Sequence, residues 1–285
     1  MVGGRLLCGV GDMYKILALA AAAIWLAVLA LPDNRLHVVV CDVGQGDAIL
    51  VTYKTTQMLV DGGPNASVPK CLSEHMPFYD HRIEVVILTH PQADHMNGLI
   101  DVLKRYTVLQ FVKGPAANDT DGYRELMKLL EKIPVRAVYA GDAIKFSNFR
   151  FDVIWPNRVE PCPDANGRGS TLCALGTDLN TTAIVGKVSF GDFSALLTSD
   201  AGSIAPAEPA DVLKVPHHGS KYGMTKDWLE GVQPKLAIIS VGKNGYGHPT
   251  EEVLKLLRDE GIKTLRTDWD GAVEVVSDGQ RWWLR

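Results

Sequence analysis

Imidazole and carboxylate side chains gather in the segment THPQADH, which contains His90, Asp94 and His95. It follows the apolar run EVVIL, which is typical of a strand buried on both faces. A loop at the carboxyl end of such a strand can direct several side chains at one point. His and Asp together suit zinc, manganese or iron. The segment therefore favours a metal site, although surface histidines and an Asp94 N-cap of a following helix would fit the same letters.

The histidines elsewhere strengthen the metal interpretation. Five of the eight in the chain lie in three short segments, each ending an apolar strand pattern. These five are His90 and His95, the adjacent pair His217 and His218, and His248. Such clustering indicates one shared site formed by distant parts of the chain.

The elements that must position these residues alternate between strands and helices. The runs LHVVVCDV, DAILVTY and QMLVDGG predict a strand meander, and MNGLIDVLKRY and YRELMKLLEKI (123–133) predict helices. A strand region is expected through KFSNFRFDVIWP. The second half adds a hairpin turning at Gly191-Asp192, further strands with interleaved helices, and a final hairpin at Asp278-Gly279. Two similar halves of this kind fit an α/β fold, a four-layer αββα sandwich.

Size and composition allow one large folded domain. The chain has 285 residues, of which 46% are hydrophobic, enough for a full core. The formal net charge is −4, and the Lys and Arg residues are scattered, so no broad basic surface for nucleic acid is expected. We expect residues 1–32 to be an N-terminal membrane anchor or signal segment and residues 33–285 to form the sandwich domain.

Residues 16–31, ILALAAAAIWLAVLAL, are an uncharged apolar segment that predicts one N-terminal hydrophobic helix. Sixteen residues are slightly short of the roughly 20 that span a bilayer, so a cleaved signal peptide and a buried helix compete with a permanent anchor. Arg5 and Lys15 precede the segment, which favours a cytoplasmic N-terminus and an extracytoplasmic domain. Secretion after cleavage is the alternative.

The five cysteines show no CxxC spacing, so a thiolate zinc cluster has no support. Cys162 and Cys173 bracket a loop rich in Pro, Gly and Asn, which a disulfide would close in an oxidising compartment. Two unrelated thiols explain the same spacing equally well.

Four ordered motifs resemble those of the metallo-β-lactamase superfamily. They are LVDGG (59–63), THPQADH (89–95), LLTSD (196–200) and KVPHHGS (214–220). DVGQGDA (42–48), PHHGS and SVGKNGYGHP (240–249) resemble, more narrowly, the extracellular C-terminal hydrolase domain of the competence protein ComEC. The resemblance covers residues 36–285.

The resemblance implies a role for each matching residue. Asp94 and His95 would bind one metal, Asp200 would bind it and could bridge to a second, and His217 or His218 would complete the site. His90 would bind the second metal. Asp61 would orient a ligand histidine, and His248 would hold a substrate phosphate or donate a proton, although turn residues of these types also occur for structural reasons.

Two departures weaken the second metal position. Gln92 replaces the second histidine of the HxHxDH motif, and no ligand histidine lies near Leu179-Asn180-Thr181. We therefore expect one firm divalent metal, zinc or manganese, and a second that is weak or absent, with the oxygen-rich donor set tilting the choice towards manganese.

Three functions stay open from the sequence. The resemblance implies a metal-dependent phosphodiesterase that acts on DNA during uptake, with Asp94, Asp200 and His248 as catalytic residues and Lys243 or Ser220 as helpers. A hydrolase of another extracellular phosphoester fits the acidic chain equally well. Gln92 and the missing ligand motivate a third hypothesis, a non-catalytic module. In either case, a non-catalytic module or a nuclease, a separate membrane channel protein would be the partner.

Overall fold

The computed structural model describes residues 10–29, 31–158, 162–163, 169–170 and 178–285. The chain divides into two units, Met1–Asp33 and Asn34–Arg285. In the first unit, α1 (Val10–Leu29) confirms the predicted N-terminal hydrophobic helix. Across the residues described, no helix combines the length and apolar character needed to cross a membrane.

The second unit contains an eight-stranded mixed sheet with the order β17-β16-β1-β2-β3-β4-β5-β6. The antiparallel meander predicted at its centre is confirmed, since β1 pairs with β2 and β2 with β3. From β3 to β6 the pairing is parallel. The strands are β1 (Leu36–Val40), β2 (Ile49–Tyr53), β3 (Thr56–Val60), β4 (Arg82–Leu88), β5 (Thr107–Lys113), β6 (Val135–Ala137), β16 (Val273–Ser277) and β17 (Trp282–Leu284).

A seven-stranded mixed sheet packs against it, with the order β15-β14-β13-β12-β11-β8-β7. The hairpin predicted at Gly191-Asp192 joins β11 to β12, and β12 to β15 run parallel. Its strands are β7 (Ala143–Lys145), β8 (Arg150–Trp155), β11 (Val185–Phe190), β12 (Phe193–Leu197), β13 (Val212–Lys214), β14 (Leu236–Ile239) and β15 (Lys263–Arg266). A separate two-stranded ribbon pairs β9 (Cys162–Pro163) with β10 (Gly169–Ser170).

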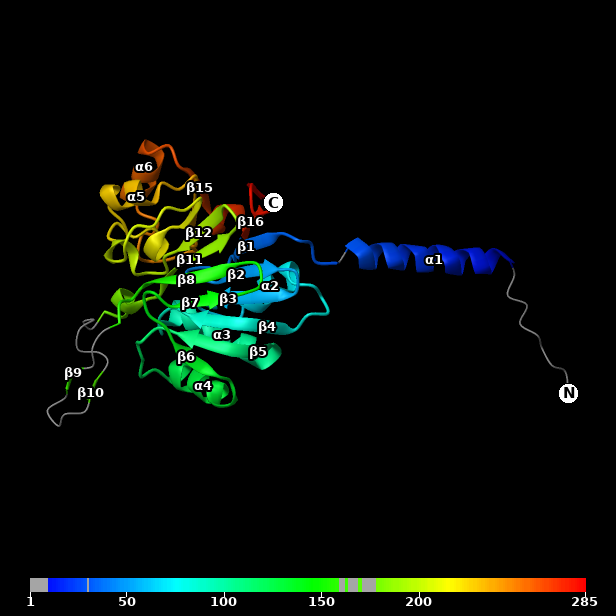
Figure 1. Ribbon diagram of the computed structural model, residues 1–285, viewed down its shortest axis with the longest axis horizontal. Helices are drawn as coiled ribbons and strands as arrows, with labels where there is room; N and C mark the ends of the chain where they lie inside the picture. The colour runs from blue at the N-terminus through cyan, green and yellow to red at the C-terminus, as the bar shows by residue number, and fades with distance from the viewer. Residues whose placement is uncertain (1–9, 30, 159–161, 164–168, 171–177) are drawn as a thin grey trace. The chain divides into compact units, whose positions relative to one another are not determined.

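Helices cover the outer face of each sheet, which confirms the four-layer αββα sandwich (Figure 1). Apolar side chains of α2, α3 and α4 pack on the first sheet, and those of α5 and α6 pack on the second. The helices are α2 (Val68–His75), α3 (Ala93–Arg105), α4 (Asp121–Leu129), α5 (Lys226–Val232), α6 (Glu251–Asp259) and α7 (Thr267–Asp270). Four 3₁₀ turns are η1 (Leu130–Lys132), η2 (Leu179–Thr182), η3 (Gly202–Ile204) and η4 (Pro216–Gly219).

Several boundaries differ from the sequence prediction. The strand expected through 145–156 is a hairpin, because residues 146–149 turn between β7 and β8. The helix expected over 123–133 begins two residues earlier and tightens into η1 at its end. Helix α3 begins at Ala93, so Asp94 and His95 lie in its first turn, where a carboxylate is favoured by the helix dipole.

The core lies between the two sheets. Side chains at alternate positions of both sheets meet there, for example Val51 and Ile87 from the first and Val188 and Leu197 from the second. The two outer clusters fix the helices to the sheets. The packed sandwich therefore restrains the loops at its edges.

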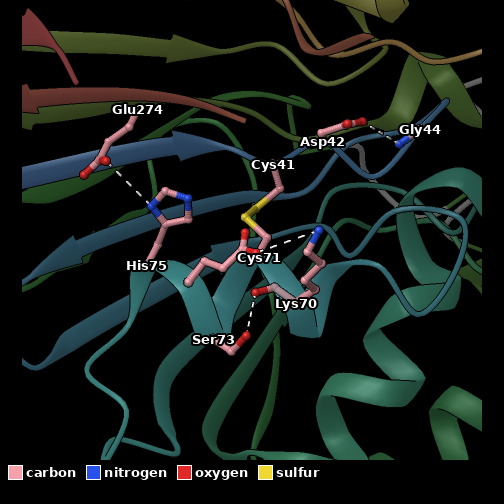
Figure 2. Close-up of a disulfide and its surroundings, with 9 residues drawn as sticks. Cys41, Asp42, Gly44, Lys70, Cys71, Ser73, His75 and Glu274 are labelled. Carbon is pink, nitrogen blue, oxygen red and sulfur yellow. Dashed lines mark hydrogen bonds and ion pairs between the residues drawn. A yellow bond between two sulfur atoms is a disulfide. The ribbon is translucent and has the colours of Figure 1, made fainter. Parts of the chain in front are cut away.

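A disulfide joins Cys41, just after β1, to Cys71 in α2 (Figure 2). The two Cα atoms are 5.9 Å apart, within the usual range for a disulfide. His75 of the same helix lies 3.7 Å from the Glu274 carboxylate on β16. These contacts fix α2 to the first sheet next to the DVGQGDA loop. The predicted Cys162–Cys173 pair stays a prediction, because Cys173 lies outside the described residues.

We expect Cys71→Ser to lower the free energy of unfolding by about 3 kcal/mol, because the bond closes a chain segment of 30 residues in the unfolded state. Urea unfolding of oxidised wild type and variant measures the difference. Reductant should bring the wild type to the stability of the variant and leave the variant unchanged. Equal midpoints for the two oxidised proteins would show that the bond does not form.

Candidate metal centre

Four side chains from three distant segments converge at one edge of the sandwich. Asp94, His95, Asp200 and His218 each offer one donor atom, and the four atoms lie within 4.8 Å of one another. His95 Nε2 is 3.4 Å from Asp200 Oδ2, and His218 Nε2 is 3.5 Å from both Asp94 Oδ2 and Asp200 Oδ1. Two imidazoles and two carboxylates at this spacing form a donor set suited to one divalent cation.

Asp61 fixes the orientation of His95. Its backbone, at the end of β3, has a left-handed conformation with φ 60°, and its buried carboxylate lies 2.8 Å from His95 Nδ1. The same carboxylate accepts hydrogen bonds from the backbone N–H and the hydroxyl of Thr89, at 2.8 and 2.7 Å. A carboxylate oxygen accepts here, so Nδ1 carries a proton, and Nε2 is the nitrogen that faces the site and can bind a metal once it loses its own proton.

A backbone carbonyl orients His218 in the same way. His218 Nδ1 lies 2.8 Å from the carbonyl oxygen of Ser240, which can only accept, so Nδ1 is the donor here too. The histidine sits in the turn η4, where His217 and His218 both have positive φ, 48° and 53°. This conformation is strained for residues other than glycine, and strained residues of this kind often cluster at functional sites. It places His218 in the interior and leaves His217 partly exposed.

The facing donor atoms lack hydrogen-bond partners within the described part of the chain. Three of these atoms are buried and unpaired: His95 Nε2, His218 Nε2 and Asp200 Oδ1. Buried polar atoms are normally hydrogen-bonded, because leaving one unpaired costs about 1–3 kcal/mol. A cation bound between these atoms would satisfy all three, so the residues fit the divalent metal that the motifs imply.

Electrostatics at the site favour positive charge. Burial alone lowers the pKa of His218, but Asp200 and Asp47 outweigh it and raise that pKa to about 9. Burial also lowers the pKa of His95, but Asp200 and Asp61 outweigh this effect and raise that pKa well above its usual value. Burial raises the pKa of Asp94, yet the neighbouring imidazoles of His218 and His95 bring it down to about 2. A cation binding here would compete with protons on the imidazoles.

A buried lysine balances further negative charge behind the site. The Lys214 ammonium, at the end of β13, is in direct contact with the Asp47 carboxylate and lies 3.9 Å from Asp200 Oδ1. It also donates to the carbonyl oxygen of Ser199 at 3.2 Å. Lys214 and Asp47 are both almost fully buried. The sequence analysis did not predict this pair, although Asp47 lies in the motif DVGQGDA and Lys214 in the motif KVPHHGS.

The DVGQGDA loop reaches α3 closely through Gly46. A Cβ atom at this position would lie 2.2 Å from the Asp94 carbonyl oxygen, and φ is +148°. Only glycine permits this approach. The approach allows Asp47 N to donate to the Asp94 carbonyl oxygen at 3.2 Å, which connects the loop to the first turn of α3.

His90 lies beside this set rather than in it. Its ring centroid is 4.2 Å from that of His95, and its Nε2 lies 3.2 Å from Gln92 Oε1. Burial and the charge on His95 lower the pKa of His90 to about 3, so the ring is neutral. Asn180 lines a cavity together with Gln92 and Asp94, and its buried Oδ1 is unpaired among described residues. Gln92 therefore offers an amide oxygen, and not an imidazole, to a second cation beside His90.

The site opens into a cavity of about 970 Å³. Its wall includes the carboxylates of Asp94 and Asp200 together with His217, Lys243 and His248. His217 Nε2 is 3.7 Å from Asp200 Oδ2. Burial lowers the pKa of both His217 and His248. Ser220, also suggested by the sequence, is buried and accepts a hydrogen bond from Tyr222 N at 3.4 Å.

Comparison with known proteins matches residues 41–243 to the Metallo-beta-lactamase superfamily. The chain belongs to the metallo-β-lactamase superfamily. The match spans more than half of the chain and includes the candidate ligands Asp94, His95, Asp200 and His218. The resemblance inferred from the motifs is thereby confirmed.

This superfamily member has curated relatives that include a competence protein. It is 30% identical to ComE operon protein 3 of Bacillus subtilis, over 82% of this chain and 32% of that protein. It is 25% identical to Competence protein ComA of Neisseria gonorrhoeae, over 86% of this chain and 33% of that protein. The chain thus spans about a third of the length of these relatives.

A solved structure shows the same metallo-β-lactamase fold. The fold protein YhfI from Bacillus subtilis superposes with a TM-score of 0.53 at 14% identity, covering 84% of this chain and 99% of that one. At this identity the likeness concerns the fold alone. It agrees with the two mixed sheets and outer helices described above.

We expect Asp61→Asn to weaken metal binding about 10–100-fold, the range seen when an outer-shell partner of a ligand is removed. The asparagine can still accept from Thr89 N, but its NH₂ group cannot accept the proton of His95 Nδ1. Titration of the metal-free protein with zinc or manganese measures the change. Asp42→Asn, in an exposed part of the DVGQGDA loop, is the matched control. Equal affinities for both variants would remove Asp61 from the account.

Proposed function

We propose that this protein is a metal-dependent phosphodiesterase that cleaves DNA. One observation carries the proposal: two buried imidazole Nε2 atoms and two carboxylates face one point and lack other partners among the described residues. The point opens into a cavity large enough for a chain segment of a phosphodiester polymer. The name of one relative, Competence protein ComA, connects the family branch to competence, which together with the resemblance of the motifs motivates DNA as the substrate.

We further propose one firmly bound cation, zinc or manganese, at Asp94, His95, Asp200 and His218. The balanced set of two oxygen and two nitrogen donors suits either metal. The position beside His90 is weaker, because Gln92 supplies a neutral amide there. Such ligands compensate less of a cation's charge than carboxylates do.

In this proposal, different residues at the site have different roles in hydrolysis. A divalent cation held here would lower the pKa of a water molecule and stabilise charge on phosphoryl oxygens. Asp94 and Asp200 are ionised at neutral pH and can accept a hydrogen bond from that water. His248, neutral because burial lowers its pKa, donates an N–H hydrogen bond to a phosphate oxygen. Lys243, in the same wall, provides positive charge for a flanking phosphate.

We propose an extracytoplasmic location, as the charges around residues 16–31 predict. The Cys41–Cys71 disulfide supports this location, because such bonds persist in oxidising compartments and are rare in the cytosol. A membrane channel for DNA is the partner that this function would require.

The test compares wild type with Asp94→Ala on single-stranded DNA, double-stranded DNA and bis-p-nitrophenyl phosphate, with zinc or manganese present. The proposal predicts cleavage of DNA by the wild type and none by the variant. Cleavage of the small diester alone would favour another phosphoester as substrate. A wild type that binds metal and cleaves nothing would indicate a non-catalytic module, and equal cleavage by both proteins would remove the site from consideration.

A further inference from the structure

The loop 242–248 forms one wall of the cavity and contains an aromatic side chain that the proposed chemistry does not use. Tyr246 is 77% exposed, yet it lines the same cavity as Asp94 and Asp200. Its ring centroid lies 5.8 Å from that of His248, with the two planes inclined by 31°. The His248 ring in turn lies 5.6 Å from that of His217, which is next to Asp200. Aromatic rings thus continue from the candidate metal centre to the rim.

The loop is held in one conformation by the side chain of Asn244. Its Nδ2 donates to the carbonyl oxygens of Gly242 and His248, at 2.9 and 2.8 Å. Its Oδ1 accepts from the backbone N–H groups of Tyr246 and His248, at 3.0 and 3.1 Å. The full hydrogen-bonding capacity of the amide is therefore spent on this loop.

The base of the loop is fixed as well. A Cβ atom at Gly242 would lie 2.4 Å from the Gly44 carbonyl carbon, so the loop rests directly on the DVGQGDA loop. Gly242 N also donates to Gln45 Oε1 at 3.4 Å. A rigid loop presents Tyr246 to the cavity without an ordering cost on binding. Tyr246 has little packing role, since most of its surface is exposed.

We propose that Tyr246 is a stacking subsite for a nucleobase adjacent to the phosphodiester held at the metal centre. The inference rests on the proposed function and deepens it by naming the part of the substrate, a nucleobase, that Tyr246 would bind. An exposed aromatic ring in a cavity that a cationic side chain also lines is an arrangement by which proteins bind single strands, with stacking on the base and Lys243 for the phosphate. Stacking tolerates any base, so the subsite selects unpaired nucleic acid over a duplex rather than one sequence.

The test measures binding by the metal-free full chain in EDTA, so that no hydrolysis interferes. Fluorescence anisotropy gives the Kd for a thymidine decamer and for a decamer of abasic sites with the same phosphates. We expect Tyr246→Ala to weaken binding of the thymidine decamer about tenfold and to leave abasic binding unchanged. Tyr246→Trp should retain tight binding. Phe78→Ala, equally exposed at 77% but outside the cavity wall, is the matched control.

Equal losses on both decamers, or no loss on either, would overturn the subsite, as would a wild type that does not distinguish them. A change of the same size for a polysaccharide phosphate would assign the ring to sugar stacking and also overturn it. Cleavage of the thymidine decamer by metal-loaded wild type reports separately on the proposed function. The two proposals can therefore fail independently.

Discussion

Asp200→Asn is expected to weaken metal binding more than about a hundredfold, beyond the 10–100-fold range of outer-shell partners, and to abolish hydrolysis. Asp200 is the one residue whose carboxylate lies within 3.5 Å of both His95 Nε2 and His218 Nε2 among the four candidate ligands. The asparagine keeps the shape of the side chain but removes the negative charge and replaces one donor oxygen with NH₂. The loss therefore reflects coordination rather than packing.

Titration with zinc and with manganese, monitored by calorimetry, measures the effect. Asp192→Asn is the matched control, because Asp192 is an exposed aspartate at the opposite end of the same strand, β12. It should bind metal and cleave substrate as the wild type does. Wild-type affinity in Asp200→Asn would show that the cation, if bound, lies elsewhere.

Lys214→Met is expected to lower the free energy of unfolding by about 3–5 kcal/mol, the cost of leaving one member of a buried ion pair without its partner. The methionine matches the unbranched stem of lysine, so packing changes little. Asp47 would keep a buried charge, and Asp200 would lose a cation 3.9 Å away. Urea unfolding in EDTA measures the loss without a contribution from bound metal.

A double variant separates charge from packing. Asp47→Asn combined with Lys214→Met should lose less stability than the sum of the two single changes, because no unpaired charge remains. Lys255→Met, which breaks an exposed pair with Asp259, should leave the unfolding midpoint nearly unchanged. Additive losses in the double variant would show that the two buried charges do not stabilise each other.

Much of the architecture follows from local patterns in the sequence. Alternating β-branched runs predict the meander of β1, β2 and β3, and the Gly191-Asp192 turn predicts the hairpin of β11 and β12. The start of α3 is missed, because Pro91 and Gln92 suggest a longer loop than the one that forms. As a result, Asp94 and His95 lie on the helix and are held more rigidly than a loop would hold them.

The site is only partly predictable from the sequence, because the residues that surround and orient the candidate ligands come from distant segments. The motifs indicate which histidines and aspartates gather, but the choice of His218 over His217 for the interior depends on the left-handed turn of η4. The pairing of Lys214 with Asp47 joins two motifs 167 residues apart, which no periodicity encodes. The same holds for Cys41 and Cys71, since cysteine spacing alone does not give Cα separation.

Anomalous diffraction from crystals soaked in zinc or manganese tests the central claim most directly. We predict a peak about 2.0–2.2 Å from His95 Nε2, His218 Nε2 and one oxygen each of Asp94 and Asp200. The peak should vanish in crystals of Asp200→Asn. A metal-saturated crystal with no peak among these four side chains, or with its strongest peak elsewhere, would contradict the account.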